Sequence, residues 1–271
     1  MITNPLRESL KPNSLPHFFC PGCGAAQVLN YFVRATDELQ IPVSSMVGIG
    51  GVGCTARIPV YLKMDAMHGI HGRTLPWATG IKLTRPDLKV VIFAGDGDAA
   101  AIGGNHLIQA ARRNLDVTMI VVNNLNYGMT GGQVAPTTYS NLRTTTTPYG
   151  NPEPAFDLVK LVEAAGATFV SRWSTNRPHQ CIRAIKKAIQ HKGFSFVEIV
   201  SQCTTGFGRK AIGSGSPSKL LDWIKERSVT ISEAEKLSNE ELSGKFVLGD
   251  FVDKQAPIFS GSSFLPPEEE A

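Results

Sequence analysis

A hydrophobic run that passes directly into an acidic, glycine-rich turn occupies residues 90–98, with the sequence VVIFAGDGD. Five consecutive apolar residues are typical of a strand that is buried on both faces of a sheet. A second run, VTMIVV at residues 117–122, is followed by the pair Asn123-Asn124, and 25 residues separate Gly97 from Asn123. The sequence therefore predicts two buried strands, joined through a helix, with Asp96 and Asn124 just beyond their ends.

Strands and helices are expected to alternate on both sides of this unit. The expected strands are residues 45–49, 90–94, 117–122, 167–170 and 194–200. The expected helices are residues 25–39, 74–83, 102–113, 156–165 and 178–191. This order predicts an α/β fold with a doubly wound, mainly parallel sheet and helices on both faces. Ligands bind such sheets outside the carboxyl ends of the strands. Asp96, Asn124 and the glycine-rich loop 50–55 all fall there.

Composition limits the classes of protein to consider. The chain has 271 residues, of which 42% are hydrophobic, so it can bury a full core. A net charge of +4 does not indicate nucleic acid. No apolar run approaches the roughly 18 residues of a membrane span. Residues 1–8 lack the apolar stretch of a secretion signal. Five cysteines do not form a disulfide framework in a reducing compartment, so we expect a cytoplasmic protein with no membrane partner.

Oxygen ligands are the first chemical signal. A carboxylate, a carboxamide and a backbone carbonyl at neighbouring strand ends form the protein half of a magnesium site that also takes phosphate oxygens. The alternative is that Asp96 and Asp98 cap the following helix. The irregular stretch 124–154 comes directly after the Asn pair, and a loop of this length there favours a functional role.

Cysteines are the second signal. Cys20 and Cys23 form a CxxC motif, Cys54 lies in the glycine-rich loop, and Cys203 follows the strand 194–200. Four such thiolates suit zinc or an iron–sulfur cluster. A redox CxxC or unrelated buried thiols are the alternatives. Cys181 sits among apolar residues of the helix 178–191, and we interpret it as a core residue.

Several motifs together resemble the β subunits of the 2-oxoacid:ferredoxin oxidoreductases. They are CPGCG at residues 20–24, HGIHGR at 68–73, GDG at 95–97, NN at 123–124, YGMTGGQ at 127–133 and PT at 136–137. The resemblance covers roughly residues 5–253. It implies a thiamine-diphosphate-binding fold, with a thiamine-diphosphate- and iron–sulfur-binding domain over residues 1–230. Residues 231–271 would be a C-terminal extension, with a small helix at 232–242 and a tail at 260–271.

The resemblance also implies roles for individual residues. One [4Fe–4S] cluster would be held by Cys20, Cys23, Cys54 and Cys203. Magnesium would be held by Asp96, Asn124 and the backbone carbonyl of Asn126. Thiamine diphosphate would be lined by Val52, Gly53, Cys54, Thr55, His71, Gly97, Asp98, Gly128 and Met129. A purely structural role for His71 and simple wall packing for Met129 remain open. Arg73 is open between a surface charge, a structural contact and a carboxylate anchor.

The implied activity is oxidative decarboxylation of a 2-oxoacid to acyl-CoA and CO2, with coenzyme A as co-substrate and electrons passed through the cluster to ferredoxin, in either direction. Some relatives with broad specificity carry a lysine where Gly131 stands, and the pattern with glycine resembles 2-oxoglutarate and branched-chain 2-oxoacid enzymes. Of these, 2-oxoglutarate is favoured, and branched-chain 2-oxoacids or pyruvate are the alternatives. No glutamate occurs between Ile41 and Asn151. The glutamate that activates the cofactor is therefore expected from an α subunit, and this chain alone is expected to be inactive. The rival functions are a non-oxidative thiamine-dependent decarboxylase and a zinc-stabilised binding module.

Overall fold

The computed structural model describes residues 5–259, and the sheet at its centre has the strand order β2-β1-β3-β4-β6-β5-β8-β7. Its strands are β1 Met46–Gly50, β2 Asp65–His68, β3 Lys89–Gly95, β4 Val117–Asn123, β5 Phe169–Ser174, β6 Phe194–Val200, β7 Ser228–Thr230 and β8 Phe246–Asp253. All neighbours pair in parallel except β5 and β8, which are antiparallel. The prediction of a mainly parallel α/β sheet is confirmed.

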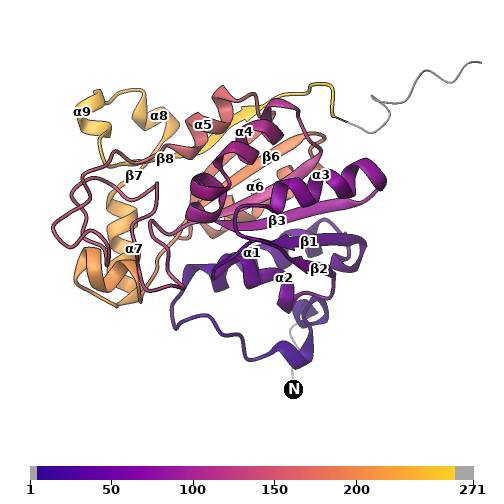
Figure 1. Ribbon diagram of the computed structural model, residues 1–271, viewed down its shortest axis with the longest axis horizontal. Coiled ribbons are helices and arrows are strands. Elements are labelled where there is room, and N and C mark those ends of the chain that lie inside the picture. The colour runs from indigo at the N-terminus through magenta and orange to yellow at the C-terminus, as the bar shows by residue number, and fades with distance from the viewer. Residues whose placement is uncertain (1–4, 260–271) are drawn as a thin grey trace, which may run out of the picture.

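Helices cover both faces of this sheet (Figure 1). The α-helices are α1 Gly24–Glu38, α2 Ile58–Tyr61, α3 Thr74–Thr84, α4 Gly104–Arg112, α5 Leu158–Ala164, α6 Pro178–Gln190, α7 Pro217–Glu226, α8 Ile231–Ala234 and α9 Asn239–Leu242. The 3-10 helices are η1 Pro5–Ser9, η2 Pro12–Ser14, η3 Val43–Ser45 and η4 Thr55–Arg57, and the π-helices are η5 Asp98–Ile102 and η6 Gly208–Ile212.

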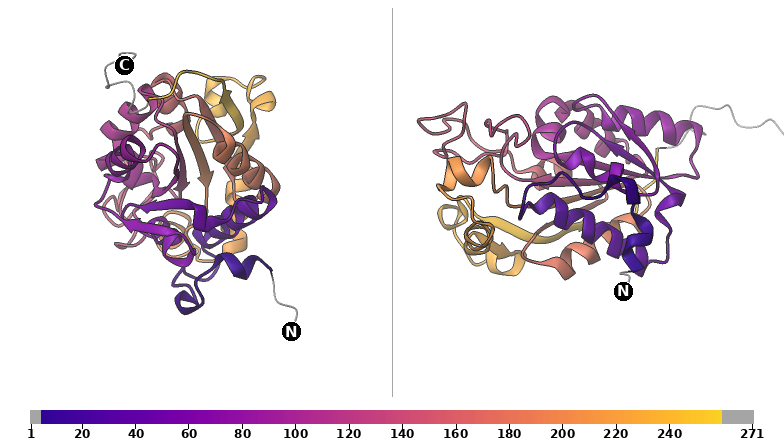
Figure 2. Two further views of the ribbon diagram at one scale, coloured as in Figure 1. Left: turned by 90° about the vertical axis from the view of Figure 1, so that its right-hand side faces the viewer. Right: turned by 90° about the horizontal axis from the view of Figure 1, so that it is seen from below.

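Strand alternation divides the interior into two cores. On β3, Val91 and Phe93 pack with α1 and α6, whereas Val90, Ile92 and Ala94 pack with α3, α4 and α5. Successive side chains of a strand point to opposite faces, so an all-apolar strand needs helices on both sides. The two views of Figure 2 show these two helical layers around the sheet.

The irregular stretch after β4 runs from Asn124 to α5, as expected, and lies beside α7 (Figure 1). At the C-terminal side, β7 and β8 pair with each other, and β8 joins the sheet through β5. The domain boundary at residue 230 stays a prediction. One small helix was predicted at residues 232–242, but the structure has two, α8 and α9. The predicted tail at 260–271 lies outside the described residues. Within residues 5–259, no helix has both the length and the apolar character needed to cross a membrane.

Candidate active site

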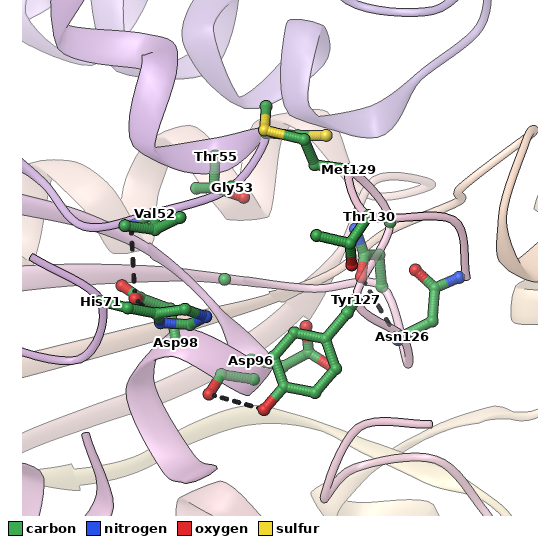
Figure 3. Close-up of a pocket in the computed structure, with 15 residues that line it drawn as sticks. Val52, Gly53, Thr55, His71, Asp96, Asp98, Asn126, Tyr127, Met129 and Thr130 are labelled. Atoms are coloured by element: carbon green, nitrogen blue, oxygen red, sulfur yellow. Dashed lines mark hydrogen bonds and ion pairs between the residues drawn. The ribbon is translucent and has the colours of Figure 1, made fainter. Parts of the chain in front are cut away.

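A cavity of about 530 Å³ opens at the carboxyl ends of β1, β3 and β4 (Figure 3). Every residue that the sequence predicted for thiamine diphosphate or magnesium lines it. These residues are Val52, Gly53, Cys54, Thr55, His71, Asp96, Gly97, Asp98, Asn124, Asn126, Gly128 and Met129. Three further residues line the cavity although no role was predicted for them: Gly95, Tyr127 and Thr130. Each is next to a residue that was predicted.

Three oxygen-bearing groups converge at the bottom of this cavity. Asp96 is 1% exposed, and burial raises the pKa of its carboxyl to about 7. One position on the Asn124 amide lies 3.3 Å from Asp96 Oδ1 and 2.7 Å from the Asn126 carbonyl. If the amide nitrogen of Asn124 occupies that position, it donates to both of these oxygens. If the amide oxygen occupies it, three oxygens converge there, from Asp96, Asn124 and the Asn126 carbonyl. Such a set, around an otherwise uncompensated carboxylate, fits a hard cation such as magnesium.

The hydroxyl of Thr137 donates to Asp96 Oδ2 and fixes the direction of the carboxylate. Thr137 belongs to the irregular stretch after β4, so that stretch helps to build the site. The N-cap residues of η5 and α4 are glycines, Gly97 and Gly103, so neither Asp96 nor Asp98 occupies the N-cap position that the capping alternative expects. Asp98 lies in the first turn of η5.

Asp98 joins two segments of the cavity wall. Its Oδ1 accepts from the backbone N–H of Gly72 at 2.8 Å and of Val52 at 3.3 Å, and lies 2.5 Å from Nδ1 of His71. Burial raises the pKa of this carboxyl. The contact occupies Nδ1, so a ligand in the cavity meets the imidazole through Nε2 or the ring face. Asp98 Oδ2 is buried without a hydrogen-bond partner among the described residues. Such an unsatisfied polar atom in a cavity wall fits a site that takes a polar ligand.

The four predicted cluster ligands are drawn together by the chain around them. The N–H of Cys23 donates to the carbonyl of Cys20, and Thr204 donates from its hydroxyl to the carbonyl of Pro21. The CxxC turn is thus tied to the segment that holds Cys203. Burial raises the pKa of Cys54 to about 12, and the charges of the Cys23, Cys203 and Cys20 thiolates add to this. The other three thiols therefore each lie within electrostatic range of Cys54.

Cys54 is the residue that links these thiols to the cavity, because it lines the cavity wall. Among residues 5–259, no three His, Cys, Asp or Glu side chains stand close enough to hold a single metal ion. An iron–sulfur cluster holds its four cysteines further apart than a single metal ion does. The spacing of these thiols is therefore compared with that of a cluster and not with that of one ion. Their sulfur-only chemistry fits that group. Cys181 is buried in the core and donates to the carbonyl of Ser174, as its core interpretation expects.

The sequence left the roles of Arg73 and Met129 open, and the structure shows the surroundings of both side chains. Arg73 donates from Nη1 to the carbonyl of Ile102 at 3.0 Å, which is a structural contact, and it is not among the residues that line the cavity. Met129 lines the cavity and is 42% exposed, so it is only half covered by other residues of the described chain. The residues that line the cavity include two aspartates and no glutamate.

Several known proteins are similar to this chain in sequence and in fold. The profile described as "Thiamine pyrophosphate enzyme, C-terminal TPP binding domain" matches residues 51–199. The chain is 50% identical over 256 residues to 2-oxoglutarate synthase subunit KorB of Methanocaldococcus jannaschii, with 94% of each chain covered. Its identity to the KorB subunit of Methanothermobacter marburgensis is 48% over 254 residues, which cover 94% of this chain and 89% of that one.

A solved structure gives the same result. It is a 2-oxoglutarate:ferredoxin oxidoreductase from Magnetococcus marinus with 2-oxoglutarate, coenzyme A and succinyl-CoA bound. The match has a TM-score of 0.83 and 33% identity, and covers 95% of this chain and 88% of that one. The motifs, the fold and these relatives agree, and the chain belongs to the 2-oxoacid:ferredoxin oxidoreductase β subunits.

Proposed function

We propose that this chain is the thiamine-diphosphate-binding subunit of an enzyme that converts 2-oxoglutarate and coenzyme A to succinyl-CoA and CO2. Two electrons leave the substrate in this reaction, and each reduces one ferredoxin. The observation that carries the proposal is the convergence of the acidic turn, the Asn pair, the glycine-rich loop and a cysteine on one cavity. The choice of 2-oxoglutarate rests on the names of the relatives and on Gly131.

Magnesium is assigned to Asp96, Asn124 and the Asn126 carbonyl, with the cofactor's diphosphate supplying further oxygens. Bound there, thiamine diphosphate supplies the carbanion chemistry at the 2-oxo carbon. This chain orients the cofactor: Asp98 holds the loop 52–54 and the turn 71–72 against each other at the cavity wall. His71 lines the same cavity, and its Nδ1 lies 2.5 Å from Asp98 Oδ1, which orients the ring.

A [4Fe–4S] cluster is assigned to Cys20, Cys23, Cys54 and Cys203. Cys54 belongs to both the cavity wall and the thiol group, so the electron acceptor would stand next to the reacting centre. A non-oxidative decarboxylase does not need an electron acceptor, so that function would not explain the four cysteines. A zinc-stabilised binding module would not explain the oxygens around Asp96.

A second subunit is assigned the glutamate that the cavity lacks. The ferredoxin partner and the cytoplasmic location stay predictions from the sequence. The direction of flux would be set by the electron carrier's potential and the CO2 level.

The function is tested with the complex purified anaerobically with its partner subunit. Viologen reduction is measured with a panel of 2-oxoacids, with and without coenzyme A. We expect reduction with 2-oxoglutarate that requires both coenzyme A and thiamine diphosphate. Asp96→Ala is expected to abolish it, because the cation loses its only charged protein ligand. Turnover without coenzyme A would contradict acyl transfer, and turnover by this chain alone would contradict the role given to the partner.

The cluster is tested separately by its colour. The anaerobic protein is expected to absorb broadly in the visible range, to lose that absorption on reduction with dithionite, and to contain iron and sulfide. Cys203→Ser is expected to lose the iron, whereas Cys181→Ser keeps it, because Cys181 is fully buried and its thiol donates to the carbonyl of Ser174. Zinc without iron or sulfide would overturn this part of the proposal.

A further inference from the structure

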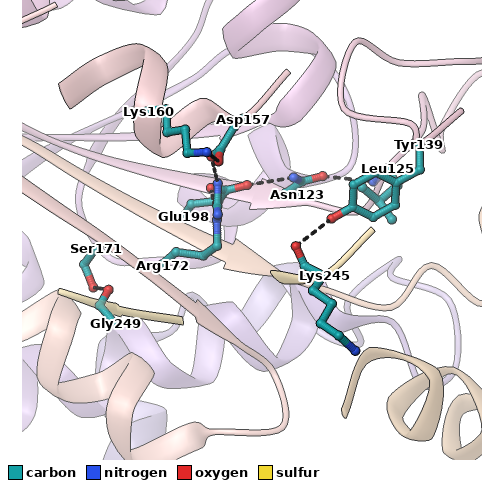
Figure 4. Close-up of polar contacts among 10 residues, drawn as sticks. All are labelled: Asn123, Leu125, Tyr139, Asp157, Lys160, Ser171, Arg172, Glu198, Lys245 and Gly249. Carbon is teal, nitrogen blue, oxygen red and sulfur yellow. Dashed lines mark hydrogen bonds and ion pairs between the residues drawn. The ribbon is translucent and has the colours of Figure 1, made fainter. Parts of the chain in front are cut away.

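A series of charged and polar side chains crosses from β5 through β6 to the end of β4 (Figure 4). Glu198 on β6 is 1% exposed and Arg172 on β5 is 6% exposed. Arg172 Nε donates to Glu198 Oε2 at 2.7 Å, and its Nη2 donates to Asp157, the residue before α5. Asp157 also faces Lys160 on the surface, at 3.8 Å. The series thus leads from the protein surface to the middle of the sheet.

Such a pair is poorly explained by stability. Taking two charges out of water costs several kcal/mol per ion, and a buried ion pair often stabilises no better than apolar residues of similar size. Every residue of β6 is buried, and Phe194 and Phe196 on the same strand belong to the core beside α5. An apolar side chain at position 198 would suit that core. The carboxylate therefore calls for another role.

That role is indicated by the second oxygen of Glu198. Its Oε1 accepts from Nδ2 of Asn123 at 2.7 Å. Val121 is the register partner of Glu198, and Asn123 is two residues further along β4, so the Asn123 side chain lies on the same face. Because Nδ2 is engaged by the carboxylate, Oδ1 of the same amide points back toward its own chain and accepts from the N–H of Leu125 at 3.1 Å.

The backbone conformation of Leu125 determines where the cation ligands on either side of it lie. Its φ is +60°, in the left-handed region that a branched residue rarely adopts without support. The Asn123 amide supports it through the N–H, and the Thr138 hydroxyl supports it through the carbonyl at 2.6 Å. Asn124 and Asn126 flank Leu125. The turn brings the Asn124 amide within 2.7 Å of the Asn126 carbonyl, which are two of the three groups assigned to magnesium.

We propose that Glu198 and Arg172 are positioning residues for the cation site, and that they act through Asn123 and the left-handed turn at Leu125. Arg172 fixes the carboxylate of Glu198, Glu198 fixes the Asn123 amide, and the amide fixes the turn. This inference rests on the proposed function, because it takes the Asp96, Asn124 and Asn126 oxygens to be a magnesium–diphosphate site. Glu198, Arg172 and Asp157 are not among the residues that line the cavity.

The test uses the complex purified with its partner subunit, and measures binding of thiamine diphosphate in saturating Mg²⁺ by calorimetry. Glu198→Gln leaves Arg172 paired with Asp157, so no unpaired charge is created and the variant should fold. It turns an N–H toward either Asn123 or Arg172. We expect affinity for the cofactor to fall by about 10-fold to 100-fold, as for other residues that orient metal ligands.

Asn123→Ala provides the second variant, because it breaks the link to Leu125 and leaves the charged pair untouched. It should lose affinity to a similar extent. The double variant should be little worse than either single one, since both act through one amide. The matched control is Lys82→Gln, which breaks a different buried ion pair, between Lys82 on α3 and Asp116, 2.9 Å apart, at the opposite end of β4. It should lower the melting temperature of the complex without changing affinity.

The outcomes separate the two claims. No binding of thiamine diphosphate by the unsubstituted complex would overturn the proposed function itself. Binding by that complex with the same affinity in Glu198→Gln and Asn123→Ala would overturn only the positioning role. Losses of affinity that simply multiply in the double variant would also count against it, because the two side chains would then act by separate routes.

Discussion

At the scale of single residues, Gly97 has its Cα packed against the ring of Tyr127, whose hydroxyl donates to the Gly97 carbonyl at 3.3 Å. A methyl group at position 97 would overlap that ring and push it into the cavity. We expect Gly97→Ala to cost about 1–3 kcal/mol of stability through overpacking, and to weaken binding of thiamine diphosphate. Gly80→Ala is the control, because no atom lies within 4 Å of its added carbon and α3 should gain about 0.5–1 kcal/mol. Equal cofactor affinity in the two variants would show that the cavity tolerates a displaced Tyr127.

Asp98 makes a second prediction at this scale. Asp98→Ala leaves the buried N–H groups of Gly72 and Val52 without their acceptor, at a cost of about 1–3 kcal/mol in unfolding free energy. Asp98→Asn keeps an acceptor for them and loses the charge beside His71, so it should be less destabilised. Chemical denaturation of the two variants measures the difference. If Asn were as destabilising as Ala, the charge on Asp98, and not the shared acceptor, would be holding the two segments together.

At the scale of elements, the sequence predicted best where burial is simplest. The apolar runs of β3, β4 and β6 were each placed to within about a residue of the observed bounds, as were the amphipathic helices α1 and α6. Most residues on both faces of those strands are apolar, so the local pattern and the final packing agree. The same argument located the site, because glycine, Asp and Asn residues stand at the ends of β3 and β4.

Other elements depend on contacts that a local pattern does not contain. β5 was expected at residues 167–170 but runs Phe169–Ser174, because its polar Ser171 and Arg172 are satisfied by Asp250 and Glu198 on other strands. β2, β8 and α7 were not predicted: β2 is largely exposed at the sheet edge, and β8 is interrupted by Gly249. The helix expected from Ile102 begins earlier, as a π-helix at Asp98, because Asp98 is drawn toward Gly72.

His191 follows α6 and gives a pH prediction for this end of the sheet. Its Nε2 lies 2.7 Å from the Thr168 hydroxyl, and burial lowers its pKa despite the nearby charges of Asp253 and Asp116. A lowered pKa means that the unfolded chain binds the proton more readily than the folded one. The stability from His191 is therefore complete above its ordinary pKa of about 6.5 and is lost as pH falls through the lowered folded value. Denaturation curves between about pH 5 and pH 7.5 should show a smaller loss at low pH in His191→Gln than in the unsubstituted protein. Parallel curves would rule out this contribution.

At the scale of the whole molecule, three exposed apolar side chains belong to or contact the segment 69–72, whose His71 lines the cavity. Ile70 is 68% exposed, Trp77 46% and Ile102 50%. Ile70 lies within this segment, and Ile102 and Trp77 pack against its Gly72 and Gly69, so we call these three side chains the apolar patch. Exposed apolar side chains that gather beside a cavity mark an interaction surface more often than scattered ones do. The patch also borders the cavity that lacks a glutamate.

We predict from these contacts that the partner subunit docks over this patch, so that a charge there should weaken the complex. Ile70→Asp adds a carboxylate to a side chain that is already mostly exposed, so the isolated chain should keep its melting temperature. Association with the partner subunit should weaken by at least roughly 1 kcal/mol, because the interface would have to bury that charge. Leu83→Asp is the matched control: it lies on the same helix as Trp77, at its far end, and is 37% exposed. Co-purification and titration of the two subunits measure the effect. If Ile70→Asp and Leu83→Asp associated equally well, the partner would have to approach the cavity from another side, and its glutamate would have to enter past the loop that follows β4.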